Sequence, residues 1–253
     1  MLVVAAPFGA TRASAHRGDC KSAPENTLPA FESAVRKRAH QIEFDVRFSK
    51  DRHLVIIHDS TVDRTTNGKG AVADLSFEEL RRLDAGSWFS PRYSGTRIPT
   101  LREVLEAIPS GIMCNVHLSN FPGLAADTAR LIAEMDRVQQ CVLACTREQA
   151  AEAKAVAPGL RICNMSGQRS WLPAYIKDTI DARAEFIQVI SGLDGLVGAV
   201  RQLHGNNISV NFFGAQDDAL IRKLVEAGVD YILTDDLDLC LKVLAEFGTT
   251  PVR

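Results

Sequence analysis

Short apolar runs alternate along this chain with longer amphipathic stretches. The runs span three to five positions and are rich in β-branched residues, as expected of buried strands. The stretches between them place apolar residues three or four positions apart, as Leu28, Phe31, Ala34 and Val35 do, which is typical of one helix face. This alternation predicts βα units around a parallel sheet.

Eight of these runs are candidate barrel strands: residues 14–16, 42–46, 115–118, 142–145, 161–164, 187–190, 209–212 and 231–234. Helices predicted between them include residues 27–38, residues 147–156 before Pro158-Gly159, and residues 216–227 before Gly228. A barrel commonly uses about 250 residues as one domain. We therefore predict an α/β fold, a (β/α)8 TIM barrel, as a single domain over residues 1–253.

One stretch interrupts this rhythm after the second strand. Residues 49–52 form a turn and residues 54–57 are again strand-like, and so short a connection favours an antiparallel hairpin. Residues from about 59 to 99 then make a long excursion. Long excursions in compact domains are often functional lids, so we expect a small inserted cap over the barrel mouth. An insertion that serves only packing is the alternative.

The composition restricts the possible partners. Of the 253 residues, 46% are hydrophobic and 24% are charged, and the net charge of −2 lacks the basic excess of nucleic-acid-binding proteins. The six cysteines form no CxxC pair, and we interpret them as free thiols in a reducing compartment. The first residues make a poor secretory signal, and no run of about 18 apolar residues exists. We expect a cytoplasmic protein without stable membrane association; its oligomeric state stays open.

Polar residues stand at the carboxyl ends of the predicted strands, where barrel active sites form. Glu43 and Asp45 lie two residues apart on one strand, so both side chains point to the same face. Two carboxylates directed into a barrel repel each other and lose hydration unless a proton or cation joins them. A hard divalent cation is the simplest partner. The alternative is a solvated or salt-bridged pair of carboxylates.

Two histidines, His16 and His58, follow short apolar runs at predicted strand ends. Histidine titrates near neutral pH and suits acid–base catalysis. If both face one phosphate, one can deprotonate an attacking hydroxyl or water while the other protonates the leaving alkoxide. Arg17 could bind that phosphate through paired donors. Each of these residues taken alone could equally be structural or exposed.

An ordered set of motifs extends this interpretation: HRG at 16–18, PENT at 24–27, IEFDV at 42–46, VIIHD at 55–59, RTTNGKG at 64–70, IPTLREVLE at 98–106 and GVDYILTDD at 228–236. Together they closely resemble the glycerophosphodiester phosphodiesterases over nearly the whole chain. The resemblance implies metal-dependent cleavage of a glycerol phosphodiester into glycerol 3-phosphate and an alcohol. It implies His16 and His58 as the acid–base pair, Arg17 as a phosphate ligand, and Glu43 and Asp45 as ligands of one divalent ion, Mg or Ca.

Two segments depart from the family pattern. The third strand of the family resembles NIEIK, whereas residues 115–119 read NVHLS. His117 thus replaces the third metal ligand, which favours Mn or Zn more than an all-oxygen site does, and Ser119 replaces the lysine near the phosphate. Strand alternation points both side chains the same way. Phe213 begins a segment that replaces a WTVN-like sequence on the leaving-group side, so we expect it beside the substrate while the released alcohol stays undetermined.

The sequence therefore predicts a phosphoric diester hydrolase acting on a small phosphodiester. One alternative is a diesterase for sugar phosphodiesters. Another is a phospholipase D-like enzyme for lysophospholipids, for which Trp88, Phe89 and Tyr93 could supply an apolar landing surface or instead pack within the cap. A third is a non-catalytic phosphate-ligand binding protein. Direct attack by water and a cyclic phosphate intermediate are both compatible with the residues.

Overall fold

Eight parallel strands close into a barrel in the computed structural model, which describes residues 9–170, 172–190, 193–250 and 252. The predicted (β/α)8 TIM barrel is confirmed, and pairing of the first two strands completes the ring. Around the ring the strands are β1 (Arg12–Ala15), β9 (Tyr231–Thr234), β8 (Ser209–Phe213), β7 (Phe186–Val189), β6 (Arg161–Asn164), β5 (Cys141–Cys145), β4 (Met113–Leu118) and β2 (Gln41–Phe48).

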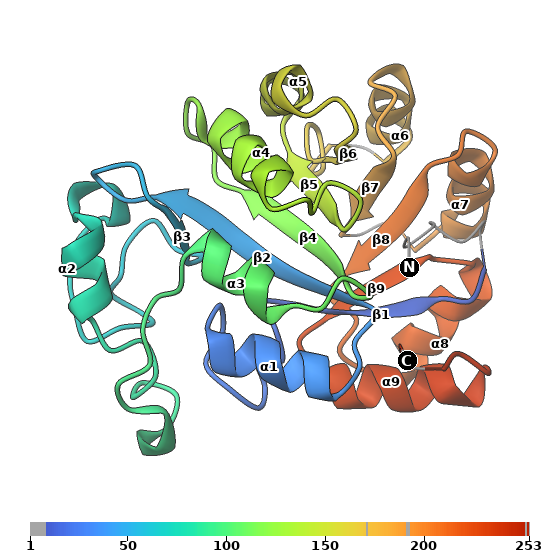
Figure 1. Cartoon of the computed structure of the whole chain (residues 1–253). Helices are drawn as coiled ribbons and strands as arrows, with labels where there is room; N and C mark the ends of the chain where they lie inside the picture. The colour runs from blue at the N-terminus through green and yellow to red at the C-terminus, as the bar shows by residue number, and fades with distance from the viewer. Residues whose placement is uncertain (1–8, 171, 191–192, 251, 253) are drawn as a thin grey trace.

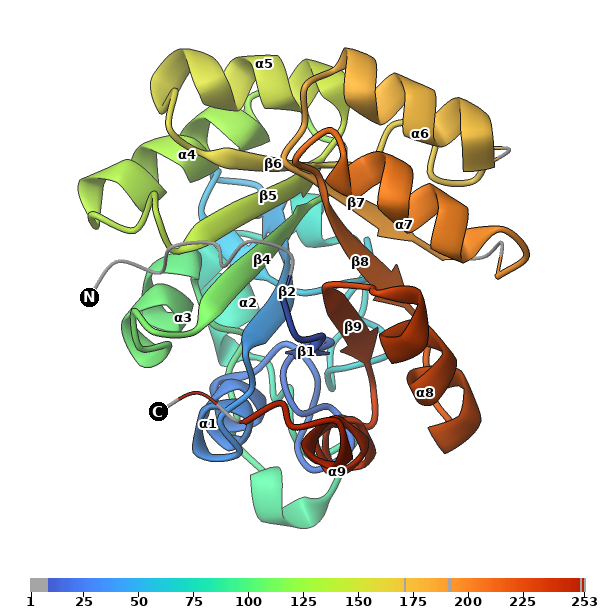
Figure 2. The same ribbon diagram turned by 90° about the vertical axis from the view of Figure 1, so that its right-hand side faces the viewer.

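Helices surround these strands on the outside (Figures 1 and 2). They are α1 (Leu28–Arg36), α3 (Leu101–Ala107), α4 (Leu124–Glu134), α5 (Arg147–Val156), α6 (Leu172–Asp181), α7 (Leu196–His204), α8 (Asp218–Ala227) and α9 (Leu237–Glu246).

The helix boundaries follow local capping chemistry. Helix α5 has its predicted bounds and begins with a capping box between Thr146 and Gln149. Helix α8 begins two residues later than predicted, because the side chain of Asp217 accepts a hydrogen bond from the backbone N–H of Leu220. It ends at Gly228, whose φ of 79° is the left-handed conformation that stops a helix.

Strand β2 shows how the barrel directs its side chains. Phe44 is fully buried in the apolar cluster that also contains helix residues such as Phe31. The residues on either side of it, Glu43 and Asp45, point into the barrel as predicted. The parallel register pairs Glu43 with Asn115 and Asp45 with His117 on β4, which brings the candidate metal ligands together.

The structure also bears on the predictions of free thiols and of no membrane-spanning segment. All six cysteines are free thiols, and all but Cys20 are buried, as expected of a protein that needs no disulfide. None of the helices in the described ranges is long and apolar enough to cross a membrane.

The inserted segment begins with the predicted hairpin, since β3 (Leu54–Ile56) pairs antiparallel with β2. It continues through two 3-10 turns, η1 (Val72–Asp74) and η2 (Pro91–Tyr93), and the short helix α2 (Phe77–Arg82). The segment has an apolar cluster separate from the barrel core, made of Val55, Ile57, Val62, Val72, Leu80, Ala85 and Ile98.

The expectation that this segment covers the barrel mouth stays a prediction. No residue from 59 to 99 is among the described residues that line the main cleft. Strand β3 pairs with the last three residues of β2, beyond the part that pairs with β1, so the inserted segment starts beside the carboxyl end of β2 (Figure 1). There the hydroxyl of Tyr93 donates a hydrogen bond of 2.7 Å to the carbonyl of Ser22.

The aromatic residues of the cap pack mainly against one another. The ring of Phe89 meets those of Trp88 and Tyr93 edge-on, at centroid distances of 5.8 and 5.7 Å. The indole N–H of Trp88 donates to the carbonyl of Ala85, although the side chain stays 41% exposed. These contacts favour the packing interpretation over a landing surface.

The two separate apolar clusters predict two separable stabilities. Leu80→Ala removes a fully buried side chain from the cap cluster and should increase amide hydrogen exchange within residues 59–99 while the barrel strands keep their protection. The matched change Leu143→Ala in the barrel should lower the free energy of unfolding by about 2–5 kcal/mol and raise exchange throughout. Equal exchange profiles for the two variants would contradict this division.

Candidate active site

The carboxyl ends of the strands open into a cleft of about 930 Å³. Seven of the eight predicted site residues line it, and the eighth, Ser119, does not. Ser119 follows the end of β4 and lines an adjoining pocket of about 240 Å³ that shares Asp45, His58 and His117 with the cleft. The seven residues in the cleft are His16, Arg17, Glu43, Asp45, His58, His117 and Phe213.

The turn after β1 has an unusual backbone conformation that positions Arg17 against Glu43. Arg17 and Gly18 both have left-handed conformations, with φ of 55° and 79°. A Cβ on Gly18 would lie 2.8 Å from the backbone of Ala30, so glycine is required by both conformation and space. The turn directs the backbone N–H of Arg17 to Oε2 of Glu43, at 3.0 Å. Non-glycine residues in this conformation concentrate at functional sites.

The two carboxylates of β2 are almost completely buried, with 3% of Glu43 and 6% of Asp45 exposed. Nδ1 of His117 lies 3.1 Å from Oδ1 of Asp45 and 3.8 Å from Oε1 of Glu43. The amide of Asn26 fixes Asp45 from the other side, donating to Oδ2 at 2.8 Å and accepting from its backbone N–H at 3.2 Å. The ligand atoms of Glu43, Asp45 and His117 therefore point toward one another.

Burial of two adjacent carboxylates has a direct electrostatic effect. Burial, reinforced by the charge of Asp45, raises the pKa of Glu43 to about 7. Burial also acts to raise the pKa of Asp45, but the hydrogen bond from His117 and nearby positive charges outweigh it and lower that pKa. The pKa of His117 is raised, because the hydrogen bond and charge of Asp45 exceed the opposing effect of burial. Without a cation, protons neutralise this cluster.

The donor set of this cluster fits a divalent cation. One ligand atom from each of Glu43, Asp45 and His117 lies within 4.8 Å of the others. Adjacent ligands of an octahedral ion with bonds of about 2.1 Å lie about 3.0 Å apart, close to the 3.1 Å between His117 and Asp45. An imidazole beside two carboxylates suits Mn²⁺ or Zn²⁺ better than an all-oxygen set would.

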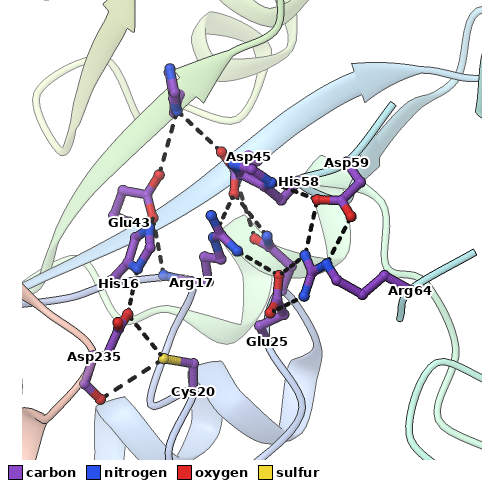
Figure 3. Close-up of polar contacts among 12 residues, drawn as sticks. His16, Arg17, Cys20, Glu25, Glu43, Asp45, His58, Asp59, Arg64 and Asp235 are labelled. Carbon is purple, nitrogen blue, oxygen red and sulfur yellow. Dashed lines mark hydrogen bonds and ion pairs between the residues drawn. The ribbon is translucent and has the colours of Figure 1, made fainter. Parts of the chain in front are cut away.

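Both histidines are oriented by a carboxylate in the same way (Figure 3). Nδ1 of His16 lies 2.6 Å from Oδ1 of Asp235, and Nδ1 of His58 lies 2.7 Å from Oδ1 of Asp59. In each, Nε2 has no hydrogen bond to another described residue, although Nε2 of His16 lies 3.9 Å from Oε2 of Glu43. Burial acts to lower the pKa of His16, but its hydrogen bond to Asp235 and the charge of Glu43 raise that pKa overall. Phe213 packs against the His16 ring, with centroids 4.7 Å apart.

Arg17 keeps hydrogen-bonding capacity for an anion. Its Nη1 donates to Oε1 of Glu25 at 2.7 Å. Its Nε is buried without a hydrogen-bond partner and lies 3.6 Å from Oδ2 of Asp45. A buried donor left without a partner is costly unless an acceptor arrives, which is what a phosphate oxygen would provide.

The residues that orient the site side chains were not identified from the sequence. Asp235, Asp59, Glu25 and Asn26 all lie within the motifs PENT, VIIHD and GVDYILTDD, so their motif positions were the available signal. Their partners could not be deduced, since Asp235 is separated from His16 by 219 positions. The far side of the cleft, with Gln168, Arg169, Gln188 and Asp194, carried no sequence signal at all.

Comparison with known proteins agrees with this geometry. A model of the "Glycerophosphoryl diester phosphodiesterase family" matches residues 16–157. A glycerophosphodiester phosphodiesterase of Caldanaerobacter subterraneus subsp. tengcongensis is 33% identical, covering 92% of this chain and 98% of that protein. One of Bacillus altitudinis is 32% identical, covering 93% of this chain and 99% of that protein.

Two solved structures share the fold. A glycerophosphodiester phosphodiesterase from Agrobacterium tumefaciens has a TM-score of 0.78 at 30% identity and covers 91% of this chain and 98% of its own. An Oleispira antarctica phosphodiesterase, solved in complex with the product sn-glycerol-3-phosphate, has a TM-score of 0.81 at 27% identity and covers 93% of this chain and 97% of its own. Together with the site geometry, these similarities show that the chain belongs to the glycerophosphoryl diester phosphodiesterase family and is a phosphoric diester hydrolase.

Proposed function

We propose that this enzyme hydrolyses a glycerophosphodiester to an alcohol and a phosphomonoester such as glycerol 3-phosphate, by acid–base catalysis with two histidines. The observation that carries the proposal is the shared cleft, in which His16 and His58 flank the cluster of Glu43, Asp45 and His117. The named activity of the relatives, and the product bound to the Oleispira antarctica protein, support the same reaction.

Arg17 binds the phosphate beside the acidic cluster. The unpartnered Nε of Arg17 donates to a non-bridging oxygen, while Glu25 holds the rest of the guanidinium in place. Glu43, Asp45 and His117 would hold one divalent cation, which would supply positive charge where the transition state gains negative charge. With His117 among its ligands, the site accepts Mn²⁺ or Zn²⁺ as well as the Mg²⁺ or Ca²⁺ expected for the family.

The two histidines move the protons. One Nε2 takes a proton from the attacking water or substrate hydroxyl, and the other gives a proton to the leaving alkoxide. The carboxylates at Nδ1 hold each ring in its orientation. The His16–Asp235 and His58–Asp59 pairs are alike in geometry, so the structure does not distinguish the acid from the base. Measuring how the activity of each histidine variant depends on the leaving group would assign the two roles.

A second candidate substrate is favoured by the lining of the cleft beyond His16. This arm of the lining combines the apolar residues Met165, Ile190, Phe212, Phe213 and Leu233 with four polar residues, Gln168, Arg169, Gln188 and Asp194. A sugar would need several buried polar partners there, and Gln188 is the buried polar side chain available among the described lining residues of the arm. The arm therefore favours a lysophospholipid-like diester over a sugar phosphodiester. Ser119, in the adjoining pocket, would contact only a substrate group that extends past His117.

The alternative of a non-catalytic phosphate-ligand binding protein does not fit a member of a hydrolase family with this site. A cytoplasmic location, action of residues 1–253 as one domain, and the absence of nucleic-acid partners stay predictions.

Removing either histidine tests the proposed chemistry. His16→Ala and His58→Ala should each lower kcat/KM for glycerophosphoethanolamine by about 10²–10⁴-fold, measured at saturating Mn²⁺ by release of glycerol 3-phosphate. The control is His53→Ala, since His53 is half exposed, stacks on Phe77 and lies outside the cleft. Wild-type turnover in either active-site variant would refute the mechanism.

Metal binding should depend on pH through the buried acid. Because the pKa of Glu43 is raised to about 7, the apo site holds a proton below that pH, and a cation must displace it. Calorimetric titration with Mn²⁺ should show affinity falling by up to about tenfold per pH unit below 7. Glu43→Gln should lose binding, whereas Glu103→Gln, on α3 away from the cluster, should not. A constant affinity between about pH 8 and 6 would contradict this.

The apolar arm predicts a preference for an acylated alcohol. Ile190→Asn should raise KM for a lysophospholipid about tenfold, the effect of losing roughly 1.4 kcal/mol of apolar contact, and leave KM for glycerophosphoethanol unchanged. Val197→Asn, a 45% exposed position outside the cleft, is the matched control. Equal KM values for acylated and unacylated substrates in the wild-type enzyme would rule out the second candidate.

A further inference from the structure

One arginine of the inserted segment joins two carboxylates at the edge of the active site. Arg64 donates to Asp59 through Nε and Nη2, at 2.7 and 2.9 Å. It donates to Glu25 through Nη1 and Nη2, both at 2.8 Å. One planar guanidinium therefore makes two bidentate ion pairs, the geometry that sets apart an ordered network from an isolated surface pair.

Each of these carboxylates holds a residue of the proposed chemistry (Figure 3). Oδ1 of Asp59 contacts Nδ1 of His58, and Oε1 of Glu25 accepts from Nη1 of Arg17. The backbone of His58 is fixed separately, because Arg47 donates to its carbonyl through Nε and Nη2 at 2.8 and 2.6 Å. The hydrogen bond to Asp59 therefore orients the His58 ring, and the two hydrogen bonds from Arg64 orient the Asp59 carboxylate.

We propose that Arg64 is a positioning residue that sets the orientations of His58 and Arg17 together, through Asp59 and Glu25. The inference rests on the proposed function, in which His58 transfers a proton and Arg17 binds the phosphate. It gives the inserted segment a role beside the mouth: its own apolar cluster anchors a loop that delivers Arg64 to the barrel.

The electrostatics of the pair support this arrangement. The hydrogen bonds from Arg64 lower the pKa of Asp59, and they lower that of Glu25 against the opposing effect of burial. Both carboxylates therefore stay ionised as acceptors for His58 and Arg17 at neutral pH. A lysine at this position has no planar fork and could not satisfy both carboxylates in this geometry.

Arg64→Ala and Arg64→Lys test the proposal in the full-length enzyme loaded with Mn²⁺. Each should lower kcat/KM for glycerophosphoethanolamine by about 10–100-fold, the usual effect of losing a partner that orients an active-site ligand. The loss in Arg64→Ala should be partly reversed by millimolar guanidinium ion. Arg64→Lys keeps the charge and should keep the thermal stability, so loss of folding cannot account for its lower activity.

The dependence on leaving group separates positioning from general weakening. Across diesters with alkoxide and nitrophenolate leaving groups, Arg64→Ala should show the same pattern as His58→Ala. In the background of Glu25→Gln and Asp59→Asn, adding Arg64→Ala should cause no further loss. Arg81→Ala is the matched control, because Arg81 ties α2 to Glu103 of α3 at 3.1 Å without touching the site, and it should keep wild-type activity.

Three results would overturn the proposal. One is kcat/KM within twofold of wild type in both Arg64 variants, and another is a loss of kcat/KM in Arg81→Ala equal to that in Arg64→Ala. The third is that Arg64→Ala lowers kcat/KM by its full factor even when Glu25→Gln and Asp59→Asn are already present. If instead His58→Ala keeps wild-type activity, the proposed function itself fails, and the two failures are distinguishable.

Discussion

Glu43 and Asp45 lie side by side in the throat of the barrel, and the burial of their charges constrains everything around them. Five carboxylates and two arginines make up the network in Figure 3: Glu25, Glu43, Asp45, Asp59 and Asp235, with Arg17 and Arg64. The acids outnumber the arginines, so further positive charge has to come from protons or from a cation. Three of these acids, Asp235, Glu25 and Asp59, hold the side chains of His16, Arg17 and His58.

A layer of supporting contacts holds the groups that face the cleft. Asn26 and Arg17 adopt left-handed backbone conformations, with φ of 56° and 55°, and each makes a hydrogen bond to an acid of β2. This strained backbone is compatible with a stable fold because the barrel core beneath it is closely packed and apolar. Rigid strands set the positions of the ligands, and the loops add the partners that set their orientation.

The inserted segment reaches the residues around the active site without lining the main cleft. Its apolar cluster stands apart from the barrel core, and its ordered ion pairs reach the barrel mouth from the side. The cleft stays open above the phosphate site and extends into an apolar arm. The loops after β6, β7 and β8, which also line this cleft, lie outside the span that matches the family model.

The sequence by itself determined the positions of the eight barrel strands and the bounds of helix α5, because side-chain periodicity and capping are local properties. It also brought Glu43 and Asp45 to one face, since alternation along a strand requires no tertiary information. Only the closed barrel decided that Asp235 orients His16 across 219 positions, that Ser119 lies beside the cleft, and that the insertion reaches the active site without lining the main cleft. These features depend on strand register and on the exit direction of β3, which follow from packing between distant segments.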